Sequence, residues 1–189
     1  MKKALLILAD GFEEIEAVTP IDLLRRAGIK VFVASLGYNT SVKGARGITV
    51  EADYSLSEIE NDFDALILPG GRNGAKNLAN SKIVLSLIED MNKEGKLIAA
   101  ICASPAVVLG KTTVLSGKKA TCYPGCGGDF KSDVIYVEDS VVIVDNIITS
   151  RGPGTASDFS LAIIKVLLDD NSAVNISKQT LFKSIQEVI

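Results

Sequence analysis

Leu97-Ile98-Ala99-Ala100-Ile101-Cys102-Ala103-Ser104-Pro105 is the stretch of this sequence from which the fold can be predicted. Its first part, 97–101, is short, apolar and uncharged, which is typical of a strand buried on both faces of a sheet. Pro105 suits the first turn of a helix, where its missing N–H group is no loss. Cys102 is therefore expected at a tight turn between a buried strand and a helix.

The position of Cys102 allows two interpretations. Backbone amides at a helix N-terminus, together with the helix dipole, favour a thiolate and would lower the pKa of this cysteine. The alternative is a buried structural cysteine, because free cysteine is among the most buried residue types.

Further apolar runs of the same kind alternate with amphipathic segments along the whole chain. The other expected strands are 4–9, 31–34, 65–68 and 146–149. The expected helices are 13–26, 73–93, 105–109 and 155–168. This alternation predicts an α/β fold with a mostly parallel sheet covered by helices. Because no linker or internal repeat interrupts it, residues 1–189 are expected to form a single domain.

Some local features refine this pattern. Gly28 and Gly95 stand where helices should end, and Pro20 should break or redirect the first helix. Residues 48–52 are expected to be antiparallel or irregular, as are 134–137 and 141–144 around a turn at 138–140. The segment 171–189 is expected to form a terminal helix.

Composition excludes several classes of protein. The net charge is −3, from 20 basic and 23 acidic residues, so neither nucleic acid nor an anionic membrane is expected as the main partner. No apolar run approaches transmembrane length, and the run 4–9 is too short for a signal peptide. The three cysteines do not suggest a disulfide framework, and we expect a cytoplasmic protein. The sequence contains no histidine, which excludes every histidine-dependent catalytic or metal site.

Loops that follow the carboxyl ends of parallel strands commonly form the site in such folds. After 65–68 come Gly70 and Gly71, whose backbone N–H groups could face an anion, although a plain strand-to-helix turn is the better explanation of these glycines taken alone. The acidic residues Glu13, Glu14 and Glu16 could either complement a helix dipole or place one carboxyl beside Cys102. Their spacing does not choose among them. A carboxyl beside the sulfur would have a raised pKa and could hold a proton.

Two more segments contain candidate residues. The loop 150–155 could direct Arg151 toward an anion or toward a partner subunit, or it could be an ordinary turn and helix cap. Cys122 and Cys126 are interpreted as incidental thiols, because the chain offers no second ligand pair or histidine that would complete a zinc site.

Taken together, these segments resemble the ThiJ/PfpI superfamily and, within it, the parkinsonism-associated DJ-type branch, along nearly the whole chain. The segments that carry the resemblance are 9–16, 24–31, 68–71, 98–103 and 149–155. The resemblance implies a flavodoxin-like three-layer sandwich with a nucleophile-elbow cysteine. It also implies a homodimer that has the first helix at its interface.

The same resemblance assigns residues of the site by position. Cys102 corresponds to the elbow cysteine, and Glu16 corresponds to its partner carboxyl, which is held protonated. Gly71 and Ala103 correspond to backbone donors that face the sulfur, beside the site-lining Gly70. The remaining site-lining residues are Arg46, Tyr123 and Arg151, of which the arginines either line the site or pair across the dimer.

Two departures from the family pattern affect function. Peptidase-type members have a histidine directly after the cysteine, whereas this chain has Ala103, which argues against proteolysis. Many DJ-type members have a histidine near the sulfur, where this chain has Tyr123. Glu16, Tyr123 or water would therefore have to move protons.

These observations lead to alternative functions. The first is a cofactor-independent enzyme without a metal that acts on reactive dicarbonyls or on early glycation adducts, as a glyoxalase or a deglycase. The second is a non-enzymatic oxidative-stress sensor or chaperone in which Cys102 becomes a sulfinate stabilised by Glu16. The third and most distant is a peptidase or an amidotransferase-like hydrolase. The expected partners are a small carbonyl substrate or glycated adduct and a second copy of the chain.

Overall fold

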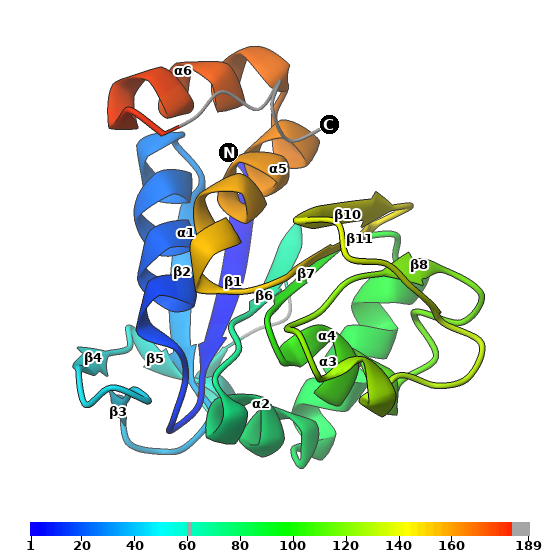
Figure 1. Ribbon diagram of the computed structural model, residues 1–189. Coiled ribbons are helices and arrows are strands. Elements are labelled where there is room, and N and C mark those ends of the chain that lie inside the picture. Colours follow the sequence, from blue (N-terminus) through cyan, green and yellow to red (C-terminus); the bar gives the residue numbers. More distant parts are fainter. Residues whose placement is uncertain (60–61, 183–189) are drawn as a thin grey trace.

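A computed structural model describes residues 1–59 and 62–182, and its centre is a seven-stranded sheet with the order β10-β11-β7-β6-β1-β2-β5 (Figure 1). The strands of this sheet are β1 (Lys3–Leu8), β2 (Lys30–Ser35), β5 (Tyr54–Ser55), β6 (Ala65–Leu68), β7 (Leu97–Ile101), β10 (Val141–Val144) and β11 (Ile147–Ser150). All neighbouring strands in it pair in parallel except β10, which is antiparallel to β11. The predicted mostly parallel α/β fold is confirmed.

Helices cover both faces of the sheet. The helices are α1 (Glu14–Arg26), α2 (Arg72–Ala79), α3 (Lys82–Lys93), α4 (Ser104–Val107), α5 (Ala156–Leu167) and α6 (Asp170–Thr180). Helix α1 packs against α5, which in turn packs against α6, whereas α2 contacts α3 and α4 in a second layer (Figure 1). Single 3₁₀ turns are η1 (Leu56–Glu58), η2 (Leu109–Lys111), η3 (Gly127–Asp129) and η4 (Pro153–Thr155).

The central strands are uniformly apolar because both of their faces are covered. Apart from Lys3 at the start of β1, the side chains of β1, β6 and β7 are almost completely buried, and they form the middle of one continuous core. Gly28 and Gly95 follow α1 and α3 with positive φ values of 81° and 67°, which confirms their predicted role at helix ends.

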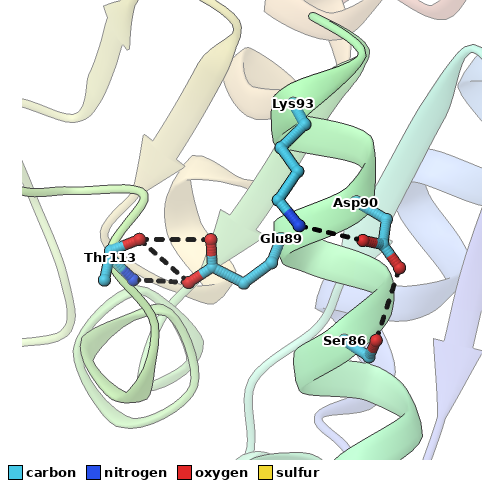
Figure 2. A network of polar contacts seen from close by, with 5 residues as sticks. All are labelled: Ser86, Glu89, Asp90, Lys93 and Thr113. Carbon is cyan, nitrogen blue, oxygen red and sulfur yellow. Dashed lines mark hydrogen bonds and ion pairs between the residues drawn. The ribbon is translucent and has the colours of Figure 1, made fainter.

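The expected single helix over 73–93 is wrong, because two helices occupy this segment. Helix α2 ends at Ala79, and Ser81 caps α3 by accepting a hydrogen bond from the Val84 N–H at 3.4 Å. A serine that accepts this bond at the first turn begins a new helix in a new direction. Helix α3 is tied to the loop after η2, where the Glu89 carboxylate accepts hydrogen bonds from the Thr113 N–H and hydroxyl (Figure 2).

Pro20 does not break the first helix, which was one of the two outcomes expected of it. It is buried within α1, which continues to Arg26. The ring removes one backbone hydrogen bond, but the packing of α1 on the core holds the helix together.

The segments 134–137 and 141–144 do not pair with each other. Instead β9 (Ile135–Tyr136) pairs in parallel with β8 (Lys119–Ala120), and β10 forms a hairpin with β11 through Asp145, whose φ is 53°. The segment 48–52 does form an antiparallel ladder, in which β4 (Thr49–Glu51) pairs with β3 (Ser41–Lys43). The terminal helix is α6, and the part of that prediction over 183–189 lies outside the described residues.

Candidate active site

Cys102 lies directly between β7 and α4, at the predicted strand–turn–helix elbow. Its φ is 66°, a left-handed conformation that costs a residue with a side chain about 1–2 kcal/mol. Backbone hydrogen bonds hold it there: the Cys102 N–H donates to the Ser150 carbonyl at 2.9 Å, and the Cys102 carbonyl accepts from the Tyr123 N–H at 2.8 Å. Ser104 anchors the start of α4 by donating its hydroxyl to the Pro69 carbonyl at 2.6 Å. Three segments distant in sequence thus hold this turn.

Glu16 is the acidic residue that reaches the cysteine. It lies in the first turn of α1 and is completely buried, with an exposed fraction of 0%. Its Oε2 accepts a hydrogen bond from the Gly70 N–H at 2.9 Å, and the carboxyl also interacts with the Cys102 thiol through a hydrogen bond. The other oxygen, Oε1, is buried and has no hydrogen-bond partner among the described residues.

The neighbouring acids have structural roles. Glu13 caps α1 by accepting a hydrogen bond from the Glu16 N–H at 2.9 Å. Glu14 accepts one from the Arg46 N–H at 2.6 Å and so holds the β3–β4 hairpin. Residue spacing did not show which of the three acids lies beside Cys102. In the structure only Glu16 points toward the sulfur.

Burial dominates the electrostatics of the pair. It raises the pKa of Glu16 to about 7, a direction that agrees with the sequence-based expectation. Burial also raises the pKa of the Cys102 thiol, and the charge of Glu16 raises it further. The backbone N–H groups of Gly71 and Ala103 hydrogen-bond to the sulfur and act in the opposite direction.

The expectation of a lowered Cys102 pKa is therefore wrong for this arrangement. Helix α4 has only 4 residues, so its dipole stabilises a thiolate only weakly. Because the sulfur is largely buried, a second negative charge beside Glu16 is unfavourable. The pair carries a single negative charge most easily, because the proton can reside on either the carboxyl or the thiol.

Gly70 and Gly71 allow this close approach. A Cβ atom on Gly70 would lie 2.5 Å from the Cys102 Cβ and 2.6 Å from Glu16 Oε2. Gly71 has a φ of 87° and packs against the backbone of the loop after β1, where a side chain would collide. The glycines are needed here for space and for backbone conformation, which sequence spacing alone did not establish.

Tyr123 lies at the rim of the site with an exposed fraction of 47%. A Cβ atom on Gly152 would lie 3.1 Å from the Tyr123 ring and 3.9 Å from Glu16 Oε1. Gly152 therefore lies close to both the Tyr123 ring and the unpaired Oε1 of Glu16, and a side chain at this position would contact both. Its place in the loop 150–155 is visible in the sequence, but its role beside Glu16 depends on tertiary contacts.

The two arginines are not joined to the Glu16–Cys102 pair. Arg151 donates to the Glu138 carbonyl at 2.9 Å and forms an ion pair of 3.7 Å with the Glu138 carboxylate. The Arg46 side chain is exposed, and only its backbone N–H has a contact that bears on the site, through Glu14. Within residues 1–59 and 62–182, neither guanidinium bonds to Glu16 or Cys102.

The other cysteines lie away from the pair. Cys102, Cys122 and Cys126 are all free thiols. Burial raises the pKa of Cys122 to about 12, and Cys126 is partly exposed. Among the described residues, no cluster of three or more cysteine, aspartate or glutamate side chains has an arrangement suited to a metal ion. None of the helices in that part of the chain has both the length and the apolar character needed to cross a membrane.

The fold and site define a flavodoxin-like α/β protein with a cysteine at a strand–helix elbow and a buried carboxyl beside it. The model of the DJ-1/PfpI family matches residues 2–166, and the chain belongs to this family. Protein dj-1beta of Drosophila melanogaster is 44% identical over 179 residues, which cover 94% of this chain and 95% of the fly protein.

Two further proteins are similar along most of the chain. The glutathione-independent glyoxalase DJR-1.2 of Caenorhabditis elegans is 38% identical over 174 residues, covering 88% of this chain and 89% of the nematode protein. The structure of oxidized Toxoplasma gondii DJ-1 matches with a TM-score of 0.93 and 42% identity, covering 96% of this chain and 99% of that one.

Proposed function

We propose that this protein converts small reactive dicarbonyls such as methylglyoxal into hydroxy acids, with Cys102 as nucleophile and Glu16 as proton carrier. The observation that carries the proposal is the buried Glu16 carboxyl, whose pKa of about 7 is suited to accepting and returning a proton near neutral pH. The similarity to a nematode glyoxalase supports the same chemistry.

The reaction needs no cofactor. The Cys102 sulfur adds to the aldehyde carbon while Glu16 takes the thiol proton and returns it to the carbonyl oxygen, which gives a hemithioacetal. Gly71 and Ala103 N–H groups stabilise negative charge on the sulfur as it forms.

The same carboxylate then moves a proton from the former aldehyde carbon to the neighbouring carbon, and the hemithioacetal hydroxyl proton passes to the oxygen of that neighbouring carbon. The first carbon is thereby oxidised to a thioester and the second is reduced to an alcohol, so no external oxidant is required. Water hydrolyses the thioester, which releases the hydroxy acid and restores the thiol. The buried, unpaired Glu16 Oε1 is a free acceptor for this transfer.

The test is lactate formation from methylglyoxal by the purified chain. Cys102→Ser should abolish it, and Glu16→Gln should lower it by at least about a hundredfold, within the usual range for loss of an acid–base group. Cys126→Ser is the matched control and should leave the rate unchanged. Turnover that survives Cys102→Ser would refute the proposal. Activity seen only with preformed glycation adducts would instead assign a deglycase.

A second candidate is a redox sensor in which peroxide oxidises Cys102 to a sulfinate. The Gly71 and Ala103 donors and a protonated Glu16 would stabilise the oxygen-bearing sulfur, and the related Toxoplasma protein has been solved in an oxidized form. Mass spectrometry after mild peroxide treatment should find two added oxygen atoms on Cys102 and none on the buried Cys122. Sulfinate formation without any lactate production would favour this function over the enzyme.

We also propose that the protein is a cytoplasmic homodimer. Helix α1 exposes Ile15 and Val18, with exposed fractions of 52% and 47%, whereas Leu24 on the same helix is buried in the core. Val18→Asp should then shift the mass in light scattering to the 20.0 kDa monomer, and the equally surface-placed Ile83→Asp should not. A monomer in the unmodified protein would contradict this. The assignment of residues 1–189 to a single domain stays a prediction.

A further inference from the structure

Two adjoining clefts lie outside the carboxyl ends of β1 and β2, and neither is lined by Cys102 or Glu16. The first, here called the basic cleft, has a volume of about 600 Å³ and is lined by Asp10, Lys43, Asn73, Lys76 and Asn77, among others. The second, the tyrosine cleft, has a volume of about 550 Å³, and its lining includes Asp10, Leu36, Tyr38, Asn39, Ser41 and Asn77. Because Asp10 and Asn77 line both, the clefts meet at these residues.

The basic cleft lies at a location where open α/β sheets commonly bind ligands. The chain leaves β1 toward β2 on one side and later adds β6 on the other, so the strand order reverses between β1 and β6. Connections diverge at such a point and leave a crevice outside the carboxyl ends. The basic cleft combines the loop after β1 with α2, the helix that follows β6, and Figure 1 shows the β3–β4 hairpin at the same end of the sheet.

The basic cleft is held in shape by hydrogen bonds around Asp10. The Lys43 N–H donates to Asp10 Oδ1 at 3.0 Å, and the Asn77 side-chain amide donates to the Asp10 carbonyl at 2.9 Å. The Gly11 N–H donates to the Lys43 carbonyl at 2.7 Å. The loop after β1, the hairpin and α2 are thus connected through a few consecutive residues, so the cleft is preformed.

The charge of the basic cleft favours an anion. Neither Lys43 nor Lys76 forms an ion pair within the part of the chain that the structure describes. Asn73 and Lys76 lie on the same face of α2, with Asn77 beside them. With one carboxylate, Asp10, against two ammonium groups, the cleft keeps a net positive charge in a protein whose total charge is −3.

The tyrosine cleft has an exposed aromatic ring in its lining. The exposed fraction of Tyr38 is 93%, and its ring packs against no other ring in the described residues. Leu36 contributes apolar surface beside it, and Asn39 and Ser41 contribute polar groups. An aromatic ring left in solvent at the side of a polar cleft is a stacking platform for a planar base.

We propose that the two clefts together bind a nucleoside monophosphate. The phosphate lies between Lys43 and Lys76, and the base stacks on Tyr38. Asp10, shared by both clefts, accepts hydrogen bonds from the ribose hydroxyls between them. This site is separate from the Cys102 chemistry and does not depend on the proposed enzymatic function.

Calorimetric titration of the full chain with AMP, adenosine and inorganic phosphate tests the site. AMP should bind with a Kd below about 1 mM, and adenosine and phosphate at least about tenfold more weakly. Tyr38→Ala should lower the affinity for AMP about tenfold or more without changing the affinity for phosphate, because stacking of one base is lost. The double variant Lys43→Gln with Lys76→Gln should lower the affinity for AMP by a similar factor without changing the affinity for adenosine.

Matched controls distinguish binding in these clefts from a general effect of protein charge and from binding at Cys102. Lys82→Gln with Lys119→Gln removes the same charge from exposed lysines elsewhere and should leave AMP binding unchanged. Cys102→Ser should also leave it unchanged. The proposal is overturned if AMP fails to bind at millimolar concentration, or if phosphate alone binds as tightly as AMP. It is equally overturned if the control lysine pair has the same effect as the cleft pair, or if Cys102→Ser abolishes binding.

Discussion

Replacing Glu16 by glutamine should change how the stability of this protein depends on pH. Burial raises the pKa of Glu16 from 4.5 to about 7, so the native state binds this proton more tightly than the unfolded chain does. Each unit of difference corresponds to about 1.4 kcal/mol, so the full effect is about 3 kcal/mol. Glutamine keeps the shape and can still accept the 2.9 Å hydrogen bond from the Gly70 N–H, but it carries no charge.

The direction of the effect follows from where the proton is bound. Between about pH 4.5 and about pH 7 the unfolded chain has lost the Glu16 proton while the native protein retains it. The free energy of unfolding of the wild type should therefore fall as the pH rises through this interval, and this contribution should stay constant above it. Glu16→Gln lacks the contribution, so the variant should equal the wild type near the acidic end and exceed its stability by up to about 3 kcal/mol at about pH 8.

Urea unfolding followed by far-UV circular dichroism measures the difference. Both proteins should carry Cys102→Ser, so that thiol oxidation does not interfere, and the difference between them cancels the other titrating groups. Glu16→Leu, which removes the polar group, tests whether the gain at high pH comes from removing charge rather than from the amide. A stability difference between the glutamine variant and the wild type that is the same at about pH 5 and about pH 8 would show that the pKa of Glu16 is not raised.

Two other substitutions test the packing. Gly70→Ala should lower the free energy of unfolding by about 2 kcal/mol and impair the site, because its Cβ would lie 2.5 Å from that of Cys102; Gly128→Ala, with open space around it, should have little effect in the same urea titration. Glu89→Ala should lower the free energy of unfolding by about 1 kcal/mol, because the hydrogen bonds to Thr113 are lost (Figure 2). Asp90→Ala removes only an exposed 3.3 Å ion pair and an exposed hydrogen bond, so thermal unfolding should show less than half of that effect.

Several features could be predicted from the sequence because their causes are local. Uninterrupted apolar runs are tolerated only where both faces of a strand are covered, so 65–68 and 97–101 were predicted with the bounds that β6 and β7 have. The place of Cys102 followed from a buried strand that meets Pro105 within a few residues. Local patterns were less reliable where they competed with packing: Pro20 lies inside α1, and Ser81 divides the segment expected to be one helix.

Residue spacing did not choose among Glu13, Glu14 and Glu16, and only the resemblance to the family named Glu16. The tertiary structure gives the physical reason, because Glu16 lies on the side of α1 that faces the loop after β6. The raised pKa of Cys102 could not be predicted from the sequence, since desolvation depends on how many groups from other segments surround the sulfur. The clefts beside Asp10 likewise unite Lys43 and Lys76, which no sequence spacing relates. Periodicity and turn residues determine what a segment becomes, whereas the distance between segments and the exclusion of water from them arise only when the chain packs.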